Sequence, residues 1–71
     1  MRYLVVIEKS ESGWGAYVPD LPGCVATAAN KEEALELISE AISLHIEDMR
    51  EQGLALPAPT SEAVMVNLDA A

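Results

Sequence analysis

The chain has 71 residues and a formal net charge of −8, with 12 acidic side chains against four Lys and Arg. A chain this short forms a single domain, and its one cysteine, Cys24, excludes disulfide stapling. The few cations argue against direct contact with nucleic acid, whose phosphates require clustered Lys and Arg. No apolar run reaches the length of a signal peptide or a membrane span, so we expect a cytoplasmic protein without membrane contact.

The negative charge has two interpretations. An acidic domain favours a basic partner, but net charge also maintains solubility. Because neither disulfides nor a metal site reinforce so small a core, we expect stability to come from oligomerisation or from a partner. The core itself must be aliphatic, since the chain has no Phe and its aromatic residues are one Trp and two Tyr.

The N-terminal half predicts three strands. Arg2–Glu8 is apolar on both alternating faces, which predicts a strand at the centre of a sheet. The polar segment Lys9–Gly13 is typical of a hairpin connection to an antiparallel second strand, Trp14–Val18. Pro19–Gly23 has the residues of a turn that interrupts the ladder, and Cys24–Ala28 follows as a short third strand.

A long helix follows over Lys31–Gln52. Asn30 is positioned to cap its start, with Glu33 at the spacing of a capping box, and Gly53 is suited to a left-handed stop. Apolar residues recur at intervals of three and four and predict one buried stripe. The stripe contains Leu35, Ile38, Ile42, His45 or Ile46, and Met49, with Ala34 and Ala41 beside it.

A last strand is predicted over Ala63–Leu68, with Val64, Val66 and Leu68 on one face. The fold class is therefore α+β, one domain over residues 1–71 in the order β-β-β-α-β, with a mostly antiparallel sheet. A right-handed crossover would place the last strand beside the first. One helix covers only one face of such a sheet, and an uncovered apolar face or edge usually marks an association surface, so we expect at least a dimer.

The segment Gly13–Cys24, followed by Glu32–Leu35, resembles the HicB-like antitoxin family. The most specific part is Pro19-Asp20-Leu21-Pro22-Gly23-Cys24 after a hairpin, and the resemblance covers nearly the whole chain. It implies a partial ribonuclease-H-like fold. It also implies an antitoxin that binds and occludes a small basic ribonuclease toxin of the HicA type.

The chain departs from the family pattern in two places. Members often carry a polar stretch such as Gly-Asp where this chain has Ala26–Asn30, which puts a contact there in doubt. Many members also append a helix-turn-helix or ribbon-helix-helix domain, whereas this chain ends soon after its expected last strand. Regulation of an operon by this chain alone is therefore not expected.

Catalysis is not expected, and neither is a metal or other cofactor. Two-metal nuclease chemistry needs converging carboxylates, but Glu8 lies only at the end of the first strand and Asp69 lies beyond the last. Glu33 or Glu36 on the helix is the remaining acid. Cys24 and His45 lack an orienting partner, so a buried cysteine and a half-buried histidine are the simpler interpretation.

We therefore interpret the chain as an antitoxin, with a stand-alone oligomeric adaptor that keeps the fold without a toxin as the alternative. The candidate contact residues are Trp14, Tyr17, Asp20, Leu21, Glu36, Glu40 and Glu47. Trp14 and Tyr17 fall on opposite faces of the second strand, and the pattern leaves open which one is exposed. The glutamates are either a docking face or an ordinary solvated face, and Pro19–Cys24 is either a contact or a turn needed for the fold.

Overall fold

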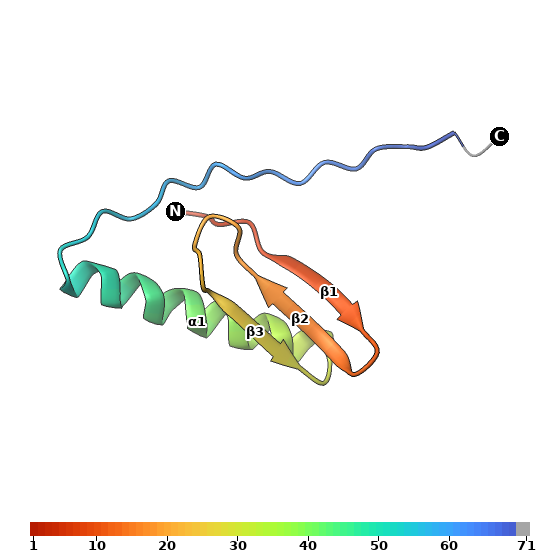
Figure 1. Cartoon of the computed structure of the whole chain (residues 1–71), viewed down its shortest axis with the longest axis horizontal. Helices are drawn as coiled ribbons and strands as arrows, with labels where there is room; N and C mark the ends of the chain where they lie inside the picture. The colour runs from red at the N-terminus through yellow and green to blue at the C-terminus, as the bar shows by residue number, and fades with distance from the viewer. Residues whose placement is uncertain (70–71) are drawn as a thin grey trace.

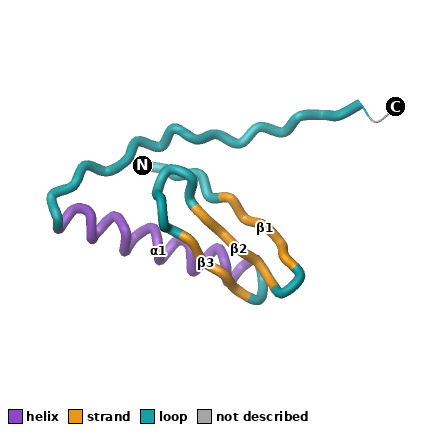
Figure 2. The backbone as a smooth tube through the Cα atoms, viewed as in Figure 1, coloured by secondary structure: helices purple, strands orange, loops and turns teal. Residues whose placement is uncertain are grey.

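Three short strands and one long helix form the body of the protein (Figure 1). In the computed structural model, which describes residues 1–69, β1 spans Val6–Ser10, β2 spans Gly13–Tyr17 and β3 spans Val25–Ala28. The helix α1 follows directly over Lys31–Glu51 and lies across one face of the sheet (Figure 2). The predicted α+β class is confirmed, as is the order of three antiparallel strands followed by a helix.

The sheet has the order β1-β2-β3, and both pairings are antiparallel. A tight turn at Glu11 and Ser12 joins β1 to β2, and Ser10 then pairs with Gly13. Gly13 has a φ of 156°, and a Cβ at this position would overlap the carbonyl oxygen of Ala28. Glycine here therefore lets the end of β3 pass close to the start of β2.

The first strand begins at Val6 rather than at Arg2, and it runs to Ser10. The cause lies in its partner strand. Opposite the residues before Val6, the amide of Val18 donates to the carbonyl of Cys24, and the carbonyl of Val18 accepts from the amide of Leu21. The Val18 groups thus point toward the β3 side, and the next residue whose backbone groups would point toward β1 is Pro19, which has no amide hydrogen, so pairing with β1 is limited to the stretch that starts at the Val6–Tyr17 pair.

The predicted last strand over Ala63–Leu68 is not formed, because residues 54–69 contain no helix or strand. The prediction that the first strand is central is likewise wrong: β1 is an edge strand and β2 is central. A strand needs a second backbone to pair with, and the chain after residue 61 runs away from β1 (Figure 1). Strand-forming residues alone therefore leave this segment extended but unpaired.

The helix begins at Lys31 as predicted and ends at Glu51, one residue before the predicted end at Gln52. The side chain of Asn30 accepts a hydrogen bond of 2.8 Å from the amide of Glu33. At the other end Gly53 has a φ of 71°, its amide donates to Arg50, and the amide of Leu54 donates to Met49, which is a Schellman arrangement. Among the described residues, no helix is long and apolar enough to cross a membrane.

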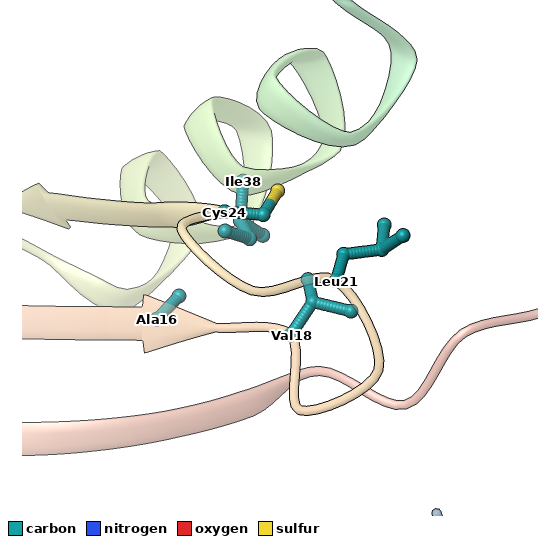
Figure 3. Close-up of a cluster of buried hydrophobic side chains, with 5 residues drawn as sticks. All are labelled: Ala16, Val18, Leu21, Cys24 and Ile38. Carbon is teal, nitrogen blue, oxygen red and sulfur yellow. The ribbon is translucent and has the colours of Figure 1, made fainter. Parts of the chain in front are cut away.

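The core is small and aliphatic, as composition predicts. The buried cluster consists of Ala16, Val18, Leu21, Cys24 and Ile38, and these side chains gather between β2, the loop that follows it and α1 (Figure 3). Tyr3, Val5 and Ile7 pack against this cluster from the N-terminal segment and β1. Leu35 was expected in the buried stripe of the helix but is exposed.

Candidate partner-binding surface

The face of the sheet that points away from α1 carries an apolar row. Because Ile7 and Ala16 pack into the core, alternation along each strand places Val6, Tyr17 and Val25 on the opposite face. The register aligns them, since Val6 pairs with Tyr17 and Tyr17 pairs with Val25. Tyr17 is 40% exposed and Val25 is 65% exposed. Three neighbouring strands thus present one continuous apolar row to solvent.

Beside this row the same face is hollowed. The next cross-strand row is Glu8, Gly15 and Thr27, in which the central residue has no side chain. A shallow hollow of about 540 Å³ lies here, lined by Glu8, Ser10, Ser12, Gly13, Trp14, Gly15, Thr27, Ala28 and Ala29. Exposed aromatic and aliphatic side chains gathered on one face are typical of protein-binding surfaces.

Trp14 and Tyr17, the two aromatic residues of β2, differ in their exposure. Trp14 shares the face of Ala16 and Val18 and is half-buried. Tyr17 lies on the open face and is exposed. Tyr17 is therefore the aromatic side chain of β2 that the open face presents.

The outer face of α1 is acidic. Glu36, Glu40 and Glu47 are all exposed, and helical periodicity places them on the side opposite the buried Ile38. The structure therefore confirms that these glutamates share a solvent-facing surface. It lies across the body from the apolar row, because α1 separates it from the sheet (Figure 1).

Leu21 requires a correction. Its side chain is 0% exposed and lies in the core cluster, so it is not a surface contact. Two successive turns place it there: the amide of Leu21 donates to Val18, and the amide of Cys24 donates to Leu21. Gly23 has a φ of 84°, as the second of these turns requires. The Pro-Asp-Leu-Pro-Gly sequence thus folds back and inserts its leucine beneath the helix.

Asp20, in the same loop, binds the C-terminal segment rather than solvent. Its carboxylate accepts hydrogen bonds from the amides of Thr60 and Ser61, each at 3.0 Å, and from both hydroxyls at 3.2 and 2.8 Å. The amide and hydroxyl of Ser61, followed by those of Thr60, lower the pKa of the Asp20 carboxyl below its ordinary value of 3.8. The sequence analysis did not predict this contact. The one sequence feature that points to it is the pair of adjacent hydroxyl residues, Thr60 and Ser61, which can donate hydrogen bonds to a carboxylate.

Within residues 1–69, the residues considered for catalysis lie on different elements of the fold. Cys24 is buried, and burial raises the pKa of its thiol, which favours the unreactive neutral form. Within residues 1–69, no three of the His, Cys, Asp and Glu side chains are grouped so as to hold a metal ion. Glu8 lies on the sheet, whereas Asp69 lies in the exposed segment after the helix.

Comparison with known proteins identifies the family. Residues 3–70 match the family described as the HicB-like antitoxin of bacterial toxin–antitoxin systems. The chain belongs to this family. A UPF0150 protein of Thermoplasma acidophilum is 38% identical over 68 residues, which cover 94% of this chain and 99% of that protein. Antitoxin HicB 2 of Photorhabdus laumondii is 33% identical over 66 residues, covering 87% of this chain and 45% of that antitoxin.

A solved structure supports the same fold. The chain is similar to one in a HicA3 and HicB3 toxin–antitoxin complex, with a TM-score of 0.69 and 30% sequence identity. The match covers 84% of this chain and 70% of that one. The HicB-like resemblance of the Gly13–Cys24 segment is therefore confirmed over most of the chain.

Proposed function

We propose that this protein is an antitoxin that neutralises a small basic ribonuclease of the HicA type by covering its active site. The observation that carries the proposal is the uncovered sheet face with the aligned row Val6, Tyr17 and Val25. Membership of an antitoxin family and similarity to a chain of a HicA–HicB complex support this role. In this proposal Tyr17 is the aromatic anchor of the interface.

The acidic face of α1 is proposed to steer the basic toxin into place. Glu36, Glu40 and Glu47 are exposed together, and the chain carries a net charge of −8. Like charges four residues apart slightly destabilise a helix, so local stability does not favour this pattern. Attraction between opposite potentials accelerates association and disfavours wrong partners.

The role is proposed to be one of binding without catalysis, in the cytoplasm and without direct contact with nucleic acid. The raised pKa of the Cys24 thiol and the scattered positions of the acidic side chains support a non-enzymatic function. The protein is also proposed to form homo-oligomers, which the exposed apolar residues after α1 favour.

The test is co-expression with the small protein encoded beside this one, followed by light scattering of the purified material. We expect a stable complex that Tyr17→Asp disrupts, since this change places a charge within the apolar row. Leu54→Asp is the matched control, because Leu54 is 52% exposed just after α1, outside the sheet face and outside residues 62–69. If the protein purifies without its neighbour and leaves that neighbour active, the adaptor interpretation replaces the antitoxin.

The charge contribution is tested separately. E36K/E40K should slow toxin association by at least about tenfold at low salt, whereas E11K/E62K makes the same change in net charge away from α1. Glu11 and Glu62 are both exposed. An equal effect of the two double variants, or no effect of either, would contradict steering by the helix.

A further inference from the structure

The eight residues after the last anchored position, residues 62–69, form an exposed tail. Val64, Met65, Val66 and Leu68 are 76%, 96%, 73% and 86% exposed. The tail projects from the body (Figures 1 and 2), and the Cα radius of gyration is 14.4 Å. A compact domain of this length has a radius of about 11 Å. Apolar side chains held this far from the body indicate a surface that becomes covered.

The tail has the sequence of a strand. Val64, Val66 and Leu68 alternate with Met65 and Asn67, and no Pro or Gly occurs after Pro59. β-branched residues and an apolar face of period two favour an extended backbone with one face buried. The tail therefore lacks only a neighbouring backbone with which to pair.

The base of the tail is held in place. The hydroxyl of Tyr3 donates a 2.6 Å hydrogen bond to the carbonyl of Pro57, and Asp20 binds Thr60 and Ser61. These contacts fix where the tail leaves the body, next to the segment that precedes β1. A hollow between the two segments is lined by Arg2, Tyr3, Leu4, Val5, Pro59, Ser61 and Glu62.

The edge that fits this donor strand is the outer edge of β1. Within residues 1–69, β1 pairs with β2 alone, so one side of its backbone has no partner strand. Val6–Ser10 contains no Pro, and its five residues match the length of 64–68. Val5 and Ile7 are only half-buried, and a strand beside β1 would cover them further. Such an unprotected edge is a template for pairing with another chain.

We propose that residues 62–69 of one copy add as a strand to the β1 edge of a second copy, and that the exchange is reciprocal. The anchors at Pro57, Thr60 and Ser61 direct the tail away from the β1 edge of its own copy (Figure 1). Each copy has one donor strand and one β1 edge, so a two-fold dimer pairs both β1 edges at once and leaves the outer edges of β3 unpaired. In the dimer β1 becomes an inner strand, and Val64, Val66 and Leu68 face the helix side. This dimer goes beyond toxin binding and does not depend on it.

The first experiment measures dimer dissociation of the full chain by light scattering and analytical ultracentrifugation. V64N/V66N should raise the dimer dissociation constant by at least about tenfold, because it removes apolar side chains from the face that becomes buried. M65N is the matched control on the opposite face and should change this constant by less than about threefold. Val66→Pro should also weaken the dimer, because proline cannot donate to the ladder. Circular dichroism of α1 checks that each variant stays folded.

The second experiment separates exchange from docking of the tail on its own copy. Variants with a cysteine introduced at one of positions 64–68 are purified apart from variants with a cysteine at one of positions 6–10, then mixed and oxidised. We expect disulfide-linked heterodimers, while the parent chain, whose Cys24 is buried, stays uncoupled. The proposal would be overturned by a monomeric wild-type chain or by a dimer that V64N/V66N does not weaken. A variant that carries both cysteines in one chain is oxidised in parallel, and disulfides that form only within that single chain would also overturn the proposal. Neither experiment involves the toxin, so both are independent of the proposed antitoxin role.

Discussion

Replacing Leu21 by alanine tests whether the Pro-Asp-Leu-Pro-Gly loop is part of the core. The side chain is 0% exposed and contacts the cluster that includes Val18 and Ile38. Truncating a buried leucine costs about 2–5 kcal/mol, of which the lost burial and the remaining cavity are the two parts. A domain of 71 residues has a total stability of about 4–10 kcal/mol. We therefore expect Leu21→Ala to lower the free energy of unfolding by about 3 kcal/mol, and Tm by about 12–24 °C.

The assay is urea denaturation followed by circular dichroism, at one fixed protein concentration because self-association would otherwise alter the result. Leu44→Ala is the matched control, since Leu44 is 66% exposed on α1, and it should change the free energy of unfolding by less than about 0.5 kcal/mol. If the two variants lose equal stability, Leu21 does not support the core. Unchanged stability together with weaker toxin binding would instead identify Leu21 as a contact residue.

Three further predictions concern Gly13, the helix cap Asn30, and the hydrogen bonds that Asp20 accepts from Thr60 and Ser61. Gly13→Ala should destabilise the protein by about 2 kcal/mol, because the new Cβ would overlap the Ala28 carbonyl oxygen. Gly15→Ala is the control, since a Cβ at Gly15 makes only ordinary contacts and should not destabilise the protein. Thermal melts of the two variants compare their stabilities. Asn30→Ala should cost about 1 kcal/mol through loss of the helix cap, and the same change at exposed Asn67 should have no effect on urea unfolding. The pKa of the Asp20 carboxyl is lower in the folded protein than its ordinary value of 3.8. The ionised carboxylate therefore stabilises the fold fully above pH 3.8, and this stabilisation is lost as the pH falls through the lower pKa of the folded state. Amide NMR signals of Thr60 and Ser61 should therefore stay unchanged down to about pH 4 and shift below it, and a Asp20→Asn variant should show the shifted signals at neutral pH.

Features governed by neighbouring residues could be predicted from the sequence. The Asn30 cap, the Gly53 stop and the hairpin between β1 and β2 each depend on contacts a few residues apart. Leu21 could not be placed in the same way. A Pro-rich loop normally lies on the surface, and only the two successive turns that fold it back bring its leucine inside.

Features that depend on distant parts of the chain could not be predicted. The partners of Asp20 lie 40 and 41 residues away, and no local pattern links them. Val64 and Val66 have the residue types of a strand, but residue type alone does not specify which backbone they pair with. The sequence predicts opposite faces for Trp14 and Tyr17, but only the position of α1 decides that the side chain of Tyr17 points outward.

We propose that this protein neutralises a ribonuclease by stoichiometric binding. The most direct measurement is cleavage of RNA by the small protein encoded beside it, titrated with this chain. We expect cleavage to fall linearly and to end at an equimolar ratio, and we expect Tyr17→Asp to remove the inhibition while the protein stays folded. Cleavage that continues in the presence of excess folded wild-type chain would contradict the proposed antitoxin function.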